Sequence, residues 1–145
     1  ASEYGSMAKL QLKIVSQERE LLDTSVDQLT VPTVEGEITI LPGHIPLVSR
    51  LKPGELRYGA DKKQSIVIVS RGFITVAAGN QVTVMVDSAV EEREISLAAA
   101  EQAVKRAEEI VKLSGDQRER VKAEAELRWA LLQLNMAERS KHSRN

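Results

Sequence analysis

Residues 35–47 of this 145-residue chain read Glu35-Gly36-Glu37-Ile38-Thr39-Ile40-Leu41-Pro42-Gly43-His44-Ile45-Pro46-Leu47. The stretch joins a short alternating strand to a turn with two prolines and one of the two histidines of the chain. Pro42 and Pro46 each fix φ near about −65° and remove a backbone donor, while Gly43 can take the positive φ of a type II turn. We therefore predict a rigid turn that holds His44 in place and suits docking.

The predicted strand belongs to a longer segment, from Leu10 to Asp87, in which apolar residues recur mostly at every second position. This period is typical of half-buried strands. Turn dipeptides separate the alternating runs at short intervals, as expected for hairpins. The segment is predicted to form roughly eight to ten short strands in an antiparallel sandwich or flattened barrel. The turn dipeptides are Val31-Pro32, Pro42-Gly43, Pro53-Gly54, Arg71-Gly72 and Gly79-Asn80.

After Asp87 the apolar period becomes that of a helix. Ser96 is a predicted N-cap, Gly115 is predicted to end the first helix, and Asp116 with Glu119 forms a capping pattern for a second. The short connection predicts an antiparallel two-helix hairpin. Alanine is frequent on the facing stripes, so the hairpin should bury little area per residue and be detachable.

These patterns divide the chain at the charge cluster near residues 90–94. We expect a β-sandwich domain at residues 9–90 and a helical hairpin domain at residues 91–145. Residues 1–8 are expected to be an expression scar and initiator region, with Met7 as the initiator.

Composition and motifs argue against several classes of function. Lys and Arg total 20 against 21 for Asp and Glu, and aromatic residues make up 3% of the chain, so neither charge nor stacking favours nucleic acid. Cysteine is absent, and no cluster of residues has metal-ligand spacing. Glu35 and Glu37 share one predicted strand face and could serve acid–base chemistry, although such a pair is more often a solvated strand edge. We expect no catalytic residue, cofactor site or metal site.

The stretch at 35–47 resembles the signature of the epsilon subunit of F-type ATP synthases, Gly-Glu-Leu-Gly-(Ile/aromatic)-x-Pro-Gly-His-x-Pro-Leu. Thr39 departs from it where a glycine is common. Shorter matches follow in order along the chain from about Lys9 to Glu138, which makes the resemblance specific. The matching positions of the signature are Gly36, Glu37, Ile40, Pro42, Gly43, His44, Pro46 and Leu47.

The resemblance implies a noncatalytic rotor subunit of the central stalk, with a ten-stranded antiparallel β-sandwich that couples the gamma subunit to the c-ring during proton-driven ATP synthesis. It implies that Glu37 pairs with basic residues of the c-ring loops and that His44 fixes the docking surface. It also places the protein peripherally on the cytoplasmic face of the bacterial plasma membrane, or on the equivalent face of another energy-transducing membrane. The residues expected at the rotor interface are Glu37, Pro42, Gly43, His44 and Pro46.

The resemblance gives the second helix a regulatory role, because in the family this helix can extend among the alpha and beta subunits and block ATP hydrolysis. Without the resemblance, its basic residues would be expected to form a solvated helix face. Family members that bind ATP carry Ile-Asp-x-x-Arg-Ala at the start of the first helix. Here Ser96 replaces the aspartate and Ala99 replaces the arginine, so ATP binding should be weak or absent. The basic residues expected to inhibit are Arg118, Arg120, Lys122 and Arg128.

Without the resemblance, the residues support only a small β-domain with an interacting helical hairpin. A β-domain adaptor and an ATP-sensing interaction module therefore remain alternatives. Association with gamma would separate the stalk subunit from the adaptor, and ATP titration would test the sensor.

Overall fold

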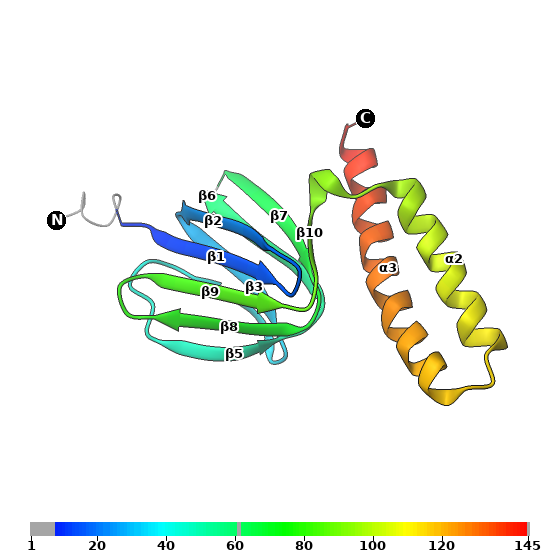
Figure 1. Ribbon diagram of the computed structural model, residues 1–145. Coiled ribbons are helices and arrows are strands. Elements are labelled where there is room, and N and C mark those ends of the chain that lie inside the picture. Colours follow the sequence, from blue (N-terminus) through cyan, green and yellow to red (C-terminus); the bar gives the residue numbers. More distant parts are fainter. Residues whose placement is uncertain (1–7, 61, 145) are drawn as a thin grey trace. The chain divides into compact units, whose positions relative to one another are not determined.

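The computed structural model describes residues 8–60 and 62–144 (Figure 1). Most of the predicted initiator region, including Met7, lies outside the described residues. By its internal contacts the chain divides into two compact units, Ala1–Val90 and Glu91–Asn145. The two units are described one at a time.

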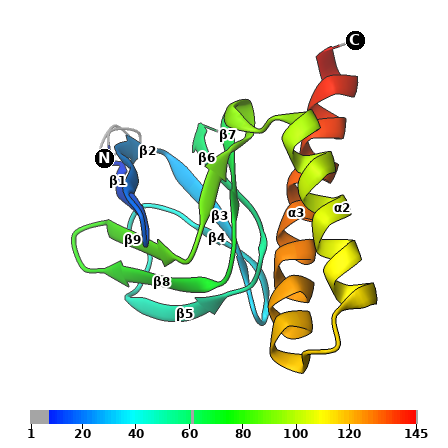
Figure 2. The ribbon, with the colours of Figure 1, turned by 45° about the vertical axis from the view of Figure 1, so that its right-hand side comes forward.

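The first unit is built from short strands that form a nearly closed sandwich (Figure 2). The strand order is β10-β7-β6-β3-β5-β8-β9-β1-β2, with β4 paired to β3. The strands are β1 Leu10–Ser16, β2 Glu20–Val26, β3 Gln28–Thr33, β4 Gly36–Ile40, β5 Leu47–Leu51, β6 Gly54–Ala60, β7 Lys63–Val69, β8 Gly72–Ala77, β9 Gln81–Val86 and β10 Ala89–Glu91.

The predicted fold class, a β-sandwich followed by two helices, is confirmed. One pairing departs from the predicted antiparallel pattern, because β1 runs parallel to β9, with Leu12 opposite Val82. The hairpin pairs on either side, β1 with β2 and β8 with β9, are antiparallel. The parallel pair brings the first strand beside the ninth and so closes one side of the sandwich.

Alternation explains which side chains form the core. In β8, Ile74 and Val76 are buried whereas Phe73 and Thr75 are exposed. The same alternation buries every second side chain along most of β1 and along β9, whereas β3 and β7 are buried at consecutive positions. Burial of this apolar area is the main favourable contribution to folding. The largest core side chains with no exposed surface include Leu12, Ile14, Leu29, Ile40, Leu56 and Ile74.

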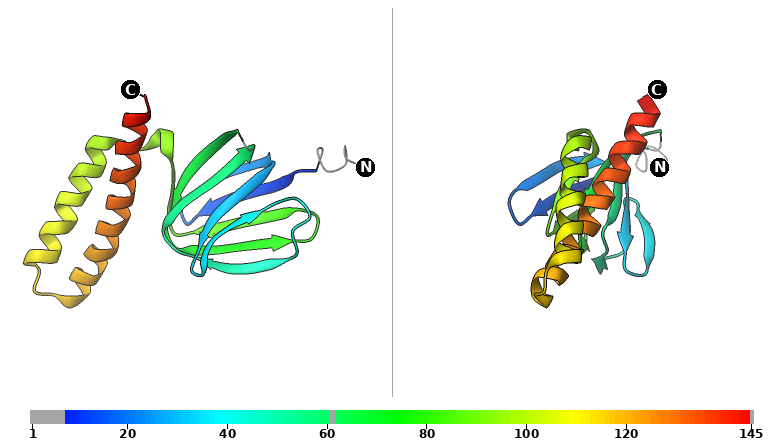
Figure 3. Two further views of the ribbon diagram at one scale, coloured as in Figure 1. Left: turned by 180° about the vertical axis from the view of Figure 1, so that it is seen from behind. Right: turned by 90° about the vertical axis from the view of Figure 1, so that its right-hand side faces the viewer.

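The second unit is an antiparallel helical hairpin (Figure 3). It begins with the short 3-10 helix η1, Glu92–Glu94, and continues with α2, Leu97–Leu113, and α3, Gln117–Arg144. The helices pack through small side chains, since the buried alanines lie on both. Those alanines are Ala100, Ala107, Ala123, Ala130 and Ala137.

The helix ends follow the sequence signals in part. Ser96 is the N-cap of α2, where its hydroxyl accepts a hydrogen bond from the Ala99 amide at 3.2 Å, as predicted. Asp116 Oδ1 accepts from the Arg118 amide at 2.9 Å. The Asp116 amide donates to Ser114 Oγ at 3.1 Å, so the reciprocal bond to Glu119 expected of a full capping box is replaced by one from the loop.

No helix within the described residues combines the length and the apolar character needed to cross a membrane.

Candidate functional site

The predicted turn is a hydrogen-bonded type II turn over residues 41–44. The His44 amide donates to the Leu41 carbonyl at 3.0 Å, Pro42 stands at the second position, and Gly43 has φ +87° at the third. A positive φ at that position is what a type II turn requires, so the predicted role of Gly43 is confirmed. Any other residue except asparagine would be strained there.

A second loop holds the turn in place. The Gly43 amide donates to Asn80 Oδ1 at 2.7 Å, across 37 positions of sequence. Asn80 lies between β8 and β9 with φ 62°, and its carbonyl accepts from the Gln11 amide at 2.8 Å. Asn80 therefore connects the turn to the start of β1 as well as to the β8–β9 loop.

His44 is half-buried and is oriented by the backbone. Its Nδ1 lies 2.7 Å from the Ile45 carbonyl, which can only accept, so Nδ1 carries the proton. In the neutral ring Nε2 is then an acceptor for a further partner. Beside it, Leu41 and Ile45 expose 51% and 74% of their surface, which gives the turn two apolar side chains at its tip.

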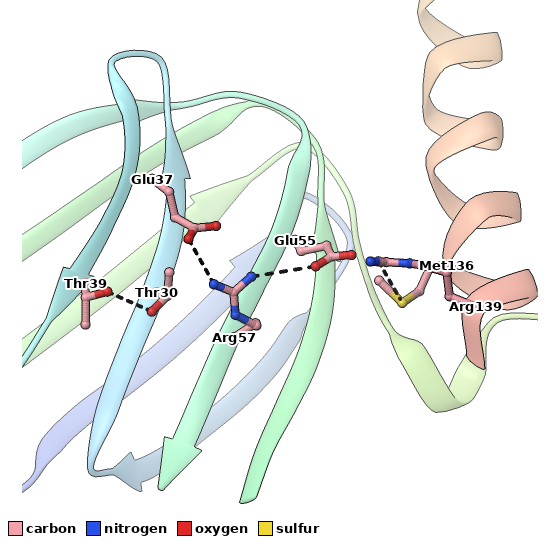
Figure 4. A network of polar contacts seen from close by, with 7 residues as sticks. All are labelled: Thr30, Glu37, Thr39, Glu55, Arg57, Met136 and Arg139. Carbon is pink, nitrogen blue, oxygen red and sulfur yellow. Dashed lines mark hydrogen bonds and ion pairs between the residues drawn. The ribbon is translucent and has the colours of Figure 1, made fainter. Parts of the chain in front are cut away.

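Glu37 lies on strand β4 and is held by an arginine of strand β6 (Figure 4). Arg57 Nη2 donates to Glu37 Oε1 at 3.0 Å, and Arg57 Nη1 lies 3.7 Å from Glu55 Oε2. On the same outer face, the hydroxyls of Thr30 and Thr39 are hydrogen-bonded at 3.0 Å. The network fixes one oxygen of Glu37, and Glu37 Oε2 has no partner among the described residues.

The five residues expected at the rotor interface fall into two groups. Four of them lie in or directly after the turn, and Glu37 stands apart, since no hydrogen bond or ion pair among the described residues joins it to the turn. The expectation that Glu35 and Glu37 share a strand face is wrong. Glu35 lies in the turn between β3 and β4, because β4 begins only at Gly36.

An exposed apolar face on strands β5, β8 and β9 was not predicted. Phe73 is opposite Met85 in the β8–β9 pair, and Val48 is opposite Thr75 in the β5–β8 pair, so these side chains share the outer face. Val48, Phe73 and Met85 expose 70%, 51% and 59% of their surface. We call these three residues the apolar face. Their positions were readable from the alternation that buries Ile74 and Val84.

The four basic residues expected to inhibit hydrolysis differ in their surroundings. Arg118, Lys122 and Arg128 are exposed on α3. Arg120 is half-buried, and its Nη1 donates to the Ser114 carbonyl at 3.2 Å. Arg120 therefore supports the end of α2, whereas the other three are available to a partner.

The arrangement offers exposed surfaces that suit docking. Within the described residues, no group of three or more His, Cys, Asp or Glu side chains could hold a metal ion. The side chains of Glu37, His44, Asn80 and Arg120 are held by local hydrogen bonds. The exposed apolar side chains lie on a sheet face and a turn. Exposed apolar surface of this kind marks interaction sites in soluble proteins.

Comparison with known proteins agrees with this description. Residues 9–92 match the family described as ATP synthase, Delta/Epsilon chain, beta-sandwich domain. The chain is 40% identical over 144 residues to the ATP synthase epsilon chain of Dehalococcoides mccartyi, covering 94% of this chain and 98% of the relative. It is 34% identical over 138 residues to ATP synthase epsilon chain 2 of Ralstonia nicotianae, covering 95% and 99%.

Solved structures show the same fold. A chain in the Euglena gracilis mitochondrial ATP synthase, solved as an OSCP/F1/c-ring assembly, aligns with a TM-score of 0.71 and 28% identity over 86% of this chain and 79% of that chain. A chain of the Tetrahymena thermophila mitochondrial ATP synthase central stalk and c-ring has a TM-score of 0.58 at 16% identity, which supports the fold alone. The match over residues 9–92 and the near full-length relatives show that this chain belongs to the ATP synthase delta/epsilon chain family.

Proposed function

We propose that this chain is a noncatalytic subunit of the central stalk of an F-type ATP synthase, which couples the gamma subunit to the c-ring during proton-driven ATP synthesis. The observation that carries the proposal is the apolar face, Val48, Phe73 and Met85, which is exposed on a chain of this family. Exposure of an apolar sheet face to water is unfavourable, and its burial against a partner lowers the free energy of the complex. We assign this face to gamma.

The turn at residues 41–46 and Glu37 are assigned to the c-ring side of the stalk. The turn is rigid through Pro42, Pro46 and the Gly43–Asn80 hydrogen bond, so it loses little conformational entropy when it docks. Glu37 Oε1 is bonded to Arg57, and its second oxygen can accept from a basic residue of a c-ring loop. Glu37 would therefore bridge Arg57 and the ring rather than leave Arg57.

The hairpin is proposed to restrain ATP hydrolysis through transient contacts with the alpha and beta subunits. Exposure of Arg118, Lys122 and Arg128 on α3 supports this role. An ATP-sensing role is disfavoured, because Ser96 is occupied as a helix cap and Ala99 carries no charge at the two positions where ATP-binding relatives carry aspartate and arginine. The protein is proposed to act peripherally, on the cytoplasmic face of its membrane or the equivalent face.

Affinity capture from native membranes tests the stalk assignment. Tagged wild-type protein should recover gamma and the c-ring. A variant with Val48→Glu and Phe73→Glu should lose gamma, because two carboxylates on the apolar face would have to be desolvated. Gln64→Glu, at an exposed site on β7, is the matched control and should behave as wild type.

Recovery of no ATP synthase subunit by the wild-type protein would contradict the stalk assignment and favour the adaptor. Equal recovery of gamma by the wild-type and double-glutamate proteins would show that gamma binds to a surface other than the apolar face. Circular dichroism of each variant would establish that the sandwich is intact.

A further inference from the structure

A pocket of about 450 Å³ lies beside the apolar face. Phe73 belongs to both, and Val34, in the turn between β3 and β4, forms another apolar part of the lining with 55% of its surface exposed. Three cationic side chains also line the pocket, Arg50, Lys52 and Arg71, with Asp87 as the acidic member of the lining. The pocket therefore combines apolar walls with excess positive charge.

Two of the three cations have no acidic partner within residues 8–60 and 62–144. Arg71 Nε lies 3.1 Å from Asp87 Oδ2, which offsets its charge locally. Among the residues that the structure describes, no carboxylate lies within ion-pair distance of Arg50 or Lys52. Their charges are therefore available to a ligand.

The backbone that carries these two cations is fixed. The Arg50 carbonyl accepts from the Val34 amide and the Lys52 amide donates to the Pro32 carbonyl, both at 3.0 Å. Arg50 is also directly opposite Phe73 in the β5–β8 register, which places a cation next to the aromatic ring position at the border of the apolar face. A ligand that covers the apolar face would meet these cations at its edge.

We propose that this pocket receives an acidic segment of the gamma subunit, with carboxylates on Arg50 and Lys52 and an apolar side chain against Phe73 and Val34. The inference rests on the proposed function and names the chemistry of the partner at one border of that interface. Charge complementarity and continuity with the apolar face favour a protein segment. An inorganic anion could satisfy the cations but would leave the apolar walls in water.

The test measures binding of the full chain to ATP synthase stripped of this subunit, at low and high salt. Arg50→Glu with Lys52→Glu is compared with Lys62→Glu with Lys63→Glu, a matched change of charge at exposed sites outside the pocket. We expect the pocket variant to bind the stripped enzyme at least about tenfold more weakly at low salt. The variant loses two ion pairs with the carboxylates of the partner, and its new glutamates repel those carboxylates. The control should change affinity by less than about threefold, and high salt should narrow the difference.

The outcomes separate this inference from the proposed function. If the wild-type protein does not bind the stripped enzyme, the stalk assignment fails and the pocket assignment fails with it. If the wild type binds, Val48→Glu weakens binding and the pocket variant equals the control, the stalk assignment stands and the acidic segment is overturned. Titration of the free wild-type chain with inorganic phosphate and with ATP completes the test, because tight binding lost in the pocket variant would assign the pocket to a small anion instead.

Discussion

The Gly43 amide donates a 2.7 Å hydrogen bond to the side chain of Asn80, and both residues have positive φ. The bond joins the proline-stiffened turn to the β8–β9 loop, and the Asn80 carbonyl extends the connection to Gln11. Two conformationally unusual residues thus stabilise each other. The rigidity of the turn comes from this tertiary contact as well as from its prolines.

Asn80→Ala should destabilise the sandwich by about 1–3 kcal/mol, since it removes one hydrogen bond and strains a residue at φ 62°. Asn80→Gly keeps the backbone conformation accessible and removes only the side-chain bond, so it should cost less. Urea denaturation of both variants measures the two contributions. Equal stability of Asn80→Ala and the wild type would show that the turn does not depend on this contact.

Gly72→Ala should be more damaging than its size suggests. A Cβ at Gly72 would lie 2.0 Å from the Met85 carbonyl oxygen and 2.7 Å from the Val86 Cα, so β8 and β9 would have to separate. We expect the free energy of unfolding to fall by at least about 1–3 kcal/mol. Gly115→Ala is the control, because nothing lies within 4 Å of its added Cβ and no positive φ is recorded there. A change of similar size in both variants would contradict the proposed close approach.

Alternation and turn residues predicted the strands, the sandwich and the type II turn, because these features depend on local sequence. The parallel pairing of β1 with β9 could not be read in this way, since it joins Leu12 to Val82 across the whole sandwich. The two-helix hairpin was predictable from its caps and its short loop. The loop hydrogen bond that replaces the Glu119 part of the capping box was not, because it depends on where Ser114 is placed.

The candidate site was predictable in part. The sequence pattern placed Pro42, Gly43 and His44 in one turn, and the structure bears out that turn. It gave no sign that Arg57 holds Glu37, because the two lie on strands that are separated by β3 in the sheet. The role of these residues at a rotor interface stays a prediction.

The sandwich should fold without the helices. Residues 8–91 keep all ten strands, whose core side chains come from the same segment. We expect a cooperative thermal transition and retained binding to the stripped enzyme. Circular dichroism and the same binding assay measure both properties. Loss of cooperative unfolding in this fragment would contradict independent folding of residues 9–90.

The isolated chain should bind ATP weakly or not at all. ATP-binding relatives carry an aspartate and an arginine in the stretch that reads Ile95-Ser96-Leu97-Ala98-Ala99-Ala100 here. Loss of one charge-assisted hydrogen bond, worth about 1.5–3 kcal/mol, lowers the affinity for ATP by about one to two decades. Isothermal titration calorimetry checks this. Micromolar affinity would contradict the prediction, and Arg93→Ala and Arg106→Ala variants would then show whether either arginine supplies the missing contact.

The helical hairpin should restrain ATP hydrolysis through the exposed cations of α3. The helix has 28 residues, about 42 Å at about 1.5 Å per residue, which is long enough to reach into a neighbouring subunit assembly when extended. Each exposed ion pair contributes little binding free energy by itself. Each of Arg118→Ala, Lys122→Ala and Arg128→Ala should therefore relieve inhibition slightly, and the triple variant should relieve it most. Added salt should have the same effect as the substitutions, while ATP synthesis is largely spared.

Arg120→Ala provides the internal comparison, because Arg120 donates to the Ser114 carbonyl and supports the hairpin instead of facing a partner. It should lower the stability of the hairpin in hydrogen exchange and change the salt dependence of inhibition little. Hydrolysis rates of the reconstituted enzyme with wild-type, triple-alanine, Arg120→Ala and tail-less subunits decide the question. Equal rates for all four would mean that the exposed cations form an ordinary solvated helix face and that this hairpin does not regulate the enzyme.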